Sequence, residues 1–244
     1  MSKIPKDPRE IFSDITNDYN NLFGDDLVSI MLYGSAASGE YIVGKSDINF
    51  MIVLSDKGID SLERTFDVIK KWKKRRVATP LFLTEDYVRT SLDAFPIEYL
   101  NLQNSHQLVY GKDILKDLTF DPHYLRLQCE REVKGKLLLL REAFLETGGK
   151  GKDLQELVAQ SVHAFVAVFN GLLYLKGKEV PRRKRDAVAE VCDTFDLDKT
   201  LFEKLLDIRE KKMKPSSTEM AGLFQAYLKE VRNMWKQLDR LATE

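Results

Sequence analysis

The sequence has little cysteine, little histidine and no excess of charge of either sign, although it is 244 residues long. Its two cysteines, Cys129 and Cys192, are far apart and lack C-x-x-C or nearby histidine spacing, so neither a disulfide framework nor a zinc site is indicated. The 38 Lys and Arg residues balance 38 Asp and Glu residues, which argues against a general attraction to nucleic acid or to a membrane surface. Because the two cysteines indicate no disulfide framework, a reduced, cytoplasmic setting is expected.

Long hydrophobic runs are also missing. The longest ones, Phe50–Leu54 and Ala164–Phe169, are far shorter than the roughly 18 to 20 apolar residues that cross a bilayer. The N-terminal stretch MSKIPKDPREIF is polar and does not resemble a signal peptide. We therefore expect a soluble protein with no membrane partner. Apolar residues nevertheless make up 43% of the chain, which is enough to fill a core.

The first half of the sequence alternates between two apolar periods. Short runs rich in β-branched and aromatic residues predict strands over residues 27–33, 48–54, 77–83, 97–102 and 107–110. Pro80 weakens the third of these, because proline cannot donate to a strand ladder. Residues 58–76 carry apolar side chains at steps of three and four, which predicts a helix. Residues 1–120 are thus expected to form one domain of strands and helices.

In the second half, helical periodicity replaces the strand patterns. Helices are predicted over residues 125–145, 154–175, 183–195, 199–212 and 217–241. Ser216 and Glu219 match the Ser-x-x-Glu capping box that begins the last of them. Residues 121–244 are therefore expected to form a second, all-α domain, a helical bundle.

The residues that suggest chemistry gather around the connection between the first two predicted strands. Gly34 and Ser35 directly follow the first strand, where glycine lets the backbone turn tightly and the serine hydroxyl and nearby amides can hold phosphate oxygens. Asp47 and Asn49 begin the next strand and share one face, since side chains alternate along a strand. Two oxygen ligands opposite a phosphate-holding turn are typical of a nucleotide site with Mg²⁺.

This pattern resembles the signature of the DNA polymerase beta type nucleotidyltransferase superfamily. The matching residues are Gly34-Ser35 and, after eleven further residues, Asp47-Ile48-Asn49. Within the superfamily, the two-part layout is similar to the kanamycin and streptomycin/spectinomycin nucleotidyltransferases. The specific resemblance covers residues 27–111, and the helical half is matched by architecture alone. It implies an α+β fold, with a nucleotidyltransferase-fold mixed sheet and flanking helices followed by an all-α helical-bundle domain.

In that family two carboxylates hold Mg²⁺ against the nucleotide phosphates, and a third on a later strand completes the metal site or takes the proton of the attacking hydroxyl. The resemblance places Asp47 at the first position and Glu98, inside the predicted strand 97–102, at the third. A glutamate on an exposed strand face is the structural alternative for Glu98. Asn49 departs from the family pattern, because an amide oxygen can bind Mg²⁺ but brings no negative charge.

The resemblance implies Mg²⁺-dependent transfer of a nucleoside monophosphate from a nucleoside triphosphate, with ATP as the expected nucleotide, to a hydroxyl of a small-molecule acceptor. The catalytic and metal-binding residues implied are Asp47, Asn49 and Glu98. The nucleotide contacts implied are Gly34, Ser35, Lys45 and Ser46, although the last two also fit an exposed loop. The alternative is a catalytically weakened or inactive nucleotide-binding or interaction protein that keeps the fold, in which Asn49 marks lost chemistry.

A second motif points to another class of protein. Residues Gly39–Ser46 satisfy the P-loop pattern G-x-x-x-x-G-K-[ST] letter by letter. A P-loop needs a strand directly before it and a helix directly after it, whereas residues 48–54 predict a strand. A P-loop NTPase is therefore only the third interpretation, because the helix N-terminus that binds phosphate would be missing.

Two basic runs, residues 70–76 and 182–185, are expected to be solvated segments beside helices. The first closes a predicted helix, where cations complement the negative helix terminus. If both lined one cleft, an RNA acceptor would be the alternative partner, which the neutral total charge argues against.

Overall fold

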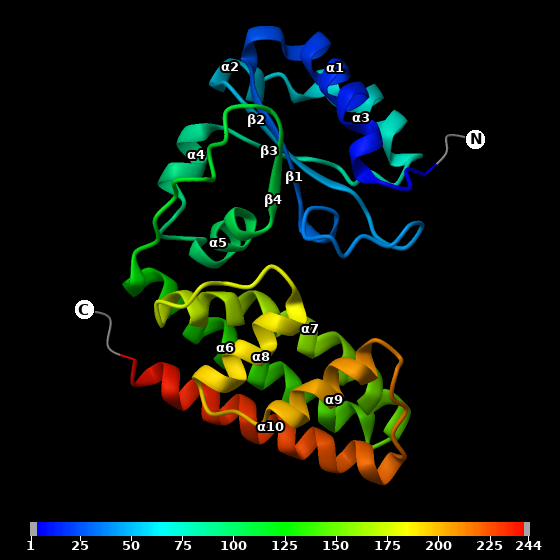
Figure 1. Cartoon of the computed structure of the whole chain (residues 1–244), viewed down its shortest axis with the longest axis vertical. Coiled ribbons are helices and arrows are strands. Elements are labelled where there is room, and N and C mark those ends of the chain that lie inside the picture. Colours follow the sequence, from blue (N-terminus) through cyan, green and yellow to red (C-terminus); the bar gives the residue numbers. More distant parts are fainter. Residues whose placement is uncertain (1–3, 242–244) are drawn as a thin grey trace. The chain divides into compact units, whose positions relative to one another are not determined.

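A four-stranded mixed sheet forms the centre of the N-terminal part of the chain (Figure 1). Its strands are β1 (Leu27–Tyr33), β2 (Asn49–Leu54), β3 (Leu81–Leu83) and β4 (His106–Gly111), in the order β3-β2-β1-β4. β1 pairs antiparallel with β2 and with β4, and β2 pairs parallel with β3. The computed structural model describes residues 4–241.

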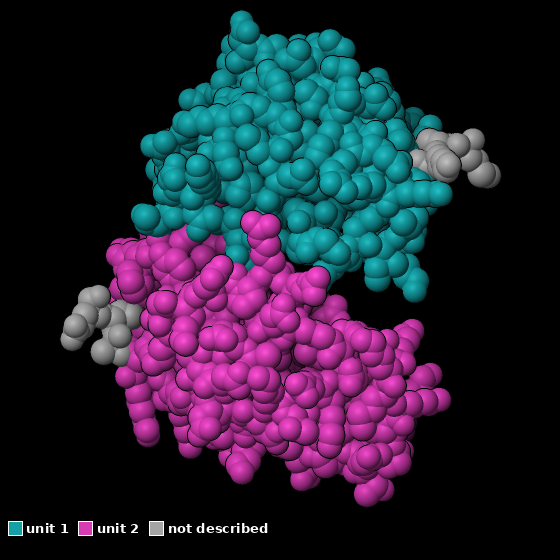
Figure 2. Space-filling view, in the orientation of Figure 1, with its two compact units in different colours: residues 1–92, 102–119 teal, residues 93–101, 120–244 magenta. Residues whose placement is uncertain are grey.

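The chain divides into two compact units, which Figure 2 colours separately. Unit 1 comprises Met1–Leu92 and Leu102–Thr119, and unit 2 comprises Asp93–Asn101 and Phe120–Glu244. The expected division at residue 120 therefore misplaces residues 93–101, which belong with the helical unit. Residues 1–3 and 242–244, which the expected domains include, lie outside the described part.

One face of the sheet carries the core of unit 1. Alternate side chains of β1 and β2 point to this face, and helices α1 (Phe12–Phe23) and α3 (Phe66–Lys73) cover it (Figure 1). The buried side chains involved are Ile15, Tyr19, Phe23, Ile30, Leu32, Ile48, Phe50, Ile52 and Trp72. Burial of each large apolar side chain contributes about 1.5 to 3 kcal/mol, so these residues stabilise the packing of α1 and α3 on this face of the sheet.

The helix predicted over residues 58–76 is interrupted. Its place is taken by α2 (Asp56–Ile59), a 3₁₀ turn at Leu62–Thr65, and α3. The strand predicted over residues 77–83 is reduced to β3 and one isolated bridge between Val77 and Ile48. Pro80 lies between the two parts and has no N–H for the ladder, which explains the shortening.

The remaining short elements of unit 1 connect these layers. They are the 3₁₀ turns Pro8–Ile11, Gly24–Asp26 and Gly34–Ala36, and the helix α4 (Glu85–Thr90). The Thr84 side chain caps α4 by accepting a hydrogen bond from the Tyr87 N–H at 3.1 Å.

The strand predicted over residues 97–102 is wrong, because this segment is the helix α5 (Pro96–Asn104). Pro96 stands at the first helical position, where its missing N–H costs nothing. The Ile97 N–H, which has no partner inside the helix, donates to Oε1 of the buried Gln128 at 2.8 Å. A short apolar run fits either period, and this contact from a distant part of the chain selects the helix.

Unit 2 contains the five helices expected from the periodicity. They are α6 (Pro122–Thr147), α7 (Gly151–Leu175), α8 (Lys184–Thr194), α9 (Lys199–Arg209) and α10 (Ser217–Asp239). Asp121 caps α6, and the capping box of Ser216 and Glu219 begins α10 as predicted. α6, α7 and α10 pack against one another, and α7 also packs against α8 and α9. The fold class is thus confirmed as a mixed sheet with flanking helices plus an all-helical part.

One described helix, α7, is long and apolar enough to cross a membrane by composition alone. Of its apolar window, 56% is buried inside the structure. Phe165 and Phe169 on α7 contact Phe202 and Tyr227 through aromatic rings, so α7 has the character of a bundle core helix.

Candidate functional site

The turn after β1 is formed by Gly34. Its φ of +74° is a left-handed conformation that glycine adopts at little cost. The Gly34 carbonyl accepts hydrogen bonds from the N–H groups of Ala37 and Ser38, both at 3.0 Å. A Cβ on residue 34 would lie 3.4 Å from Nδ2 of Asn49, so the Asn49 amide sits directly against this turn.

Asp47 and Asn49 lie on the sheet face opposite the α1–α3 core. Their neighbours Ile48 and Phe50 are fully buried in that core, and side chains alternate along the chain here. Asn49 is partly buried and pairs with Tyr33 of the neighbouring strand β1. The Asp47 side chain is 59% exposed. Of the two predicted oxygen ligands, Asn49 therefore lies against the Gly34 turn, and Asp47 lies two residues before it on the same face within unit 1.

Arg76 is the site residue that sequence analysis missed. Its Nη2 donates to Oδ1 of Asp47 at 2.9 Å and to the Lys45 carbonyl at 3.0 Å. Its backbone has a φ of +61°, and its carbonyl accepts the Ile48 N–H at 2.9 Å. The Nε of Arg76 is buried and has no hydrogen-bond partner in the part of the chain that the structure describes. The sequence shows Arg76 only as the last cation of a basic run, with nothing to distinguish it from the others.

Two further cations of the basic runs, Lys71 and Arg185, pair with carboxylates of their own unit. Lys71 pairs with Asp18 at 2.6 Å, and its ammonium lies over the Trp72 ring. In unit 2, Arg185 pairs with Asp207 at 2.6 Å and with Glu210 at 2.9 Å. These contacts are typical of structural surface charges, so nothing in them supports a nucleic-acid interface.

The segment from Gly39 to Ser46 is a series of turns rather than a P-loop. The Ile42 carbonyl accepts the N–H groups of Lys45 and Ser46 at 3.0 and 2.9 Å, and the Ser46 Oγ accepts the Ile42 N–H at 3.1 Å. A strand, β2, follows at Asn49 in place of the required helix. The P-loop interpretation is therefore wrong. Lys45 is exposed beside the turn, and its side chain is available to an anion.

A row of three residues crosses the sheet next to the site. Tyr33 on β1 pairs with Asn49 on one side and with His106 of β4 on the other. His106 is 11% exposed, and its Nε2 lies 3.1 Å from Oδ1 of Asp113. Its Nδ1 lies 2.9 Å from the Gln103 carbonyl, so both ring nitrogens face acceptors. The His106 ring thereby fixes the start of β4, a role that the sequence did not indicate.

Glu98 lies on α5 in unit 2 rather than on a strand. Its side chain is exposed, and Oε2 accepts a hydrogen bond from Nε2 of Gln128 at 2.7 Å. Because Gln128 also accepts the Ile97 N–H, one buried amide holds both the helix start and the Glu98 carboxylate. None of the four strands in the described chain contains Asp or Glu, so the expectation of a third acid on a strand is wrong.

The donor set of unit 1 fits Mg²⁺ only as an ion shared with phosphate. Asp47 offers a carboxylate and Asn49 an amide oxygen, and oxygen ligands of this kind suit Mg²⁺. Within residues 4–241 there is no group of three or more His, Cys, Asp and Glu side chains that could hold a metal ion. Mg²⁺ in proteins is usually bound by one or two carboxylates together with substrate phosphates, and these residues suffice for that.

Comparison with known proteins identifies the fold. No protein-family model and no curated protein sequence matches the chain. Among solved structures, it is similar to spectinomycin adenyltransferase AAD(9) from Enterococcus faecialis, whose structure contains ATP and spectinomycin. The TM-score is 0.53 at 11% sequence identity, and the match covers 93% of this chain and 99% of the other. The chain thus has a nucleotidyltransferase-like fold followed by a helical region.

Proposed function

We propose that this protein is a nucleotidyltransferase that moves the nucleoside monophosphate of a triphosphate, ATP in the first place, to a hydroxyl of a small-molecule acceptor. The observation that supports the proposal is that Asn49 lies against the Gly34 turn, two residues after Asp47 and on the same sheet face, opposite the core. The nucleotidyltransferase-like fold supports the same conclusion. The solved neighbour was crystallised with ATP and spectinomycin, so spectinomycin is the acceptor to test first.

Each predicted site residue of unit 1 has its own role in the proposed site. The Gly34–Ser35 turn and the Lys45 side chain hold phosphate oxygens, and Ser46 can add its hydroxyl proton while it accepts the Ile42 N–H. Asp47, with Asn49 as a neutral ligand, holds Mg²⁺. When bound, the ion would stabilise the negative charge that develops on the phosphates during transfer.

Glu98 lies on the helix α5 of unit 2, so its role as base or third ligand stays a prediction that rests on the resemblance alone. Its hydrogen bond with Gln128 orients the carboxylate. A Glu98→Gln variant keeps the size of the side chain and a partner for Gln128, so it should fold normally, bind ATP and lose transfer.

A second candidate, nucleotide binding without transfer, has observations of its own. Asn49 brings no negative charge, one oxygen of Asp47 is already bonded to Arg76, and the described strands carry no acid. A metal site with one carboxylate stabilises much less of the charge developed in phosphoryl transfer than a site with two. Both candidates share Mg²⁺-dependent triphosphate binding at the same residues, in a cytoplasmic protein.

The two candidates are separated by a transfer assay. ATP labelled at its α-phosphorus is incubated with Mg²⁺ and a panel of hydroxyl-bearing acceptors, beginning with spectinomycin. A transferase gives labelled product, which Asp47→Ala and Glu98→Gln abolish, while Asp117→Ala, a change at an exposed aspartate of unit 1, has no effect. Tight Mg²⁺-ATP binding with no labelled product across the panel would favour the binding protein.

A further inference from the structure

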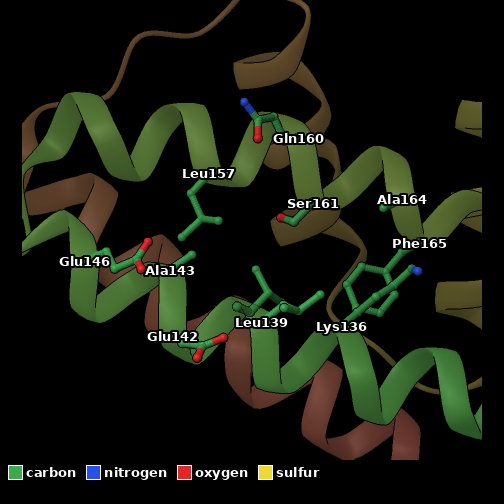
Figure 3. Close-up of a pocket in the computed structure, with 11 residues that line it drawn as sticks. Lys136, Leu139, Glu142, Ala143, Glu146, Leu157, Gln160, Ser161, Ala164 and Phe165 are labelled. Atoms are coloured by element: carbon green, nitrogen blue, oxygen red, sulfur yellow. The ribbon is translucent and has the colours of Figure 1, made fainter.

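A groove of about 350 Å³ runs between α6 and α7 of unit 2 (Figure 3). Small-molecule sites usually enclose roughly 300 to 1,000 Å³, so the groove has the size for a small organic ligand. Phe165, which is fully buried, closes its floor, and Leu139 and Leu157 form apolar walls. Ala143 and Ala164 face the space from the two helices, and their short side chains leave it open.

The charge in the groove is not balanced. Glu142 and Glu146 line it from successive turns of α6, where two like charges four residues apart repel each other. The ion pairs of α6 are Arg126–Glu130, Lys134–Glu130, Lys136–Glu132 and, to α10, Lys134–Asp239. No ion pair in residues 4–241 uses Glu142 or Glu146. Lys136 is the one cation that lines the groove, and its Nζ already pairs with Oε2 of Glu132 at 2.6 Å. The two free carboxylates favour a positively charged occupant.

A polar group lies at the floor. Ser161 lines the groove and donates its hydroxyl proton to the Val158 carbonyl at 3.2 Å. Beside it lies the hydroxyl of Tyr227, which is completely buried and faces the Ser161 hydroxyl. Phe165 packs edge-on against the Tyr227 ring, with 6.1 Å between the ring centroids. A ligand that reaches Ser161 therefore meets a polar pair in an otherwise apolar floor.

We propose that the α6–α7 groove binds a small organic amine with an apolar body. Its ammonium group pairs with Glu142 and Glu146, and its apolar part packs on Leu139, Leu157 and Phe165. All of these residues belong to unit 2, and the proposal does not depend on nucleotide binding by unit 1. Charge complementarity identifies the occupant as a cation, and the volume and apolar floor identify it as a compact amphipathic molecule.

The test uses 4-phenylbutylamine and its uncharged isostere 4-phenylbutanol, each titrated calorimetrically into the full chain. The amine should bind, and the alcohol should bind roughly tenfold more weakly, since two partly exposed ion pairs are lost. The double variant Glu142→Gln/Glu146→Gln should weaken the amine by the same factor and leave the alcohol unchanged. Glu156→Gln, a change at an exposed glutamate of α7 outside the lining, is the matched control and should change neither.

A second variant tests the location. Ala164→Phe fills the groove from an exposed position of α7 and should abolish amine binding without lowering the melting temperature. The proposal is overturned if the native chain does not bind the amine or if the amine and the alcohol bind equally. It is also overturned if neither Glu142→Gln/Glu146→Gln nor Ala164→Phe weakens amine binding. It is also overturned if sedimentation shows that a second copy of the chain covers the groove and Ala164→Phe dissociates that dimer.

Discussion

Arg76 donates a hydrogen bond from Nη2 to Oδ1 of Asp47 at 2.9 Å, across 29 residues of sequence. The same nitrogen donates to the Lys45 carbonyl, so Arg76 ties the loop before β2 to the carboxylate proposed to hold Mg²⁺. The guanidinium of Arg76 and a bound Mg²⁺ would therefore compete for the same Asp47 oxygen.

Removal of this competing charge should make ATP binding more dependent on Mg²⁺. Arg76→Gln frees both Asp47 oxygens for the ion and removes a cation that phosphate could use. We therefore expect weaker binding of ATP alone and a severalfold larger improvement on addition of Mg²⁺, measured by calorimetry with and without the ion. Lys74→Gln, a change within the same basic run, is the control. An unchanged Mg²⁺ effect in Arg76→Gln would show that Arg76 does not compete at this site.

Asn49→Asp should strengthen the metal site. The substitution keeps the size of the side chain and adds a second carboxylate on the face that carries Asp47, which Mg²⁺ prefers over an amide. The Mg²⁺ concentration that half-saturates ATP binding should fall by about tenfold, and any transfer activity should rise. Asn49→Ala should shift the Mg²⁺ requirement the other way. If Asn49→Asp leaves the requirement unchanged, position 49 does not contact the ion.

Gly34→Ala should destabilise the protein and weaken ATP binding together. The φ of +74° is left-handed, and a residue with a Cβ costs about 1 to 2 kcal/mol there. Urea unfolding should therefore show a loss of that size. Gly222→Ala, inside α10 with open space around its Cβ, is the contrasting variant and should gain about 0.5 to 1 kcal/mol. Unaltered stability in Gly34→Ala would mean that the turn is not held as described.

The strands and helices that the sequence predicts well are those with an unbroken pattern. β1 and β2 are nearly continuous apolar runs, and the five helices of unit 2 repeat their apolar residues over many turns. Both patterns reflect which side chains are buried, and the spacing of apolar residues along the sequence shows this directly. The pairing of Asp47 and Asn49 on one face follows from strand alternation for the same reason.

The features that sequence analysis missed depend on contacts between distant residues. Residues 97–102 fit either period, and the hydrogen bond from Ile97 to Gln128, 31 residues away, accompanies their helical form. Arg76 adopts a left-handed backbone although it is not glycine, and its contacts with Asp47 and Lys45 reach across the loop. No local pattern encodes either contact, so the third acid was expected on the sheet and Arg76 was counted as a solvated charge.

The Arg185 cluster of unit 2 predicts a pH dependence of stability. The Arg185 guanidinium hydrogen-bonded to Glu210 lowers the pKa of that carboxyl from 4.5 to about 2. A lowered folded-state pKa means that the stabilisation is fully present above the unfolded pKa and is lost as pH falls from about 4.5 through about 2. Its size is at most about 1 kcal/mol, because both side chains are more than one third exposed.

The measurement compares urea unfolding of the native chain and Arg185→Ala across this range. The native chain should be the more stable at pH 6, and the difference should shrink towards pH 2. Arg183→Ala, in the same basic run, should show no such change. A difference that stays constant with pH would contradict the assignment of the Glu210 shift to Arg185.

The central claim is that Asp47 and Asn49 form a Mg²⁺-dependent triphosphate site, and nucleotide binding tests it without knowledge of the acceptor. Each of the four ribonucleoside triphosphates is titrated by calorimetry into the native chain and into Asp47→Ala, with and without Mg²⁺. We expect ATP to bind with a Kd of order micromolar in the presence of Mg²⁺, much more weakly without the ion, and not at all to Asp47→Ala. Failure of the native chain to bind any triphosphate, or equal binding by Asp47→Ala, would contradict the account.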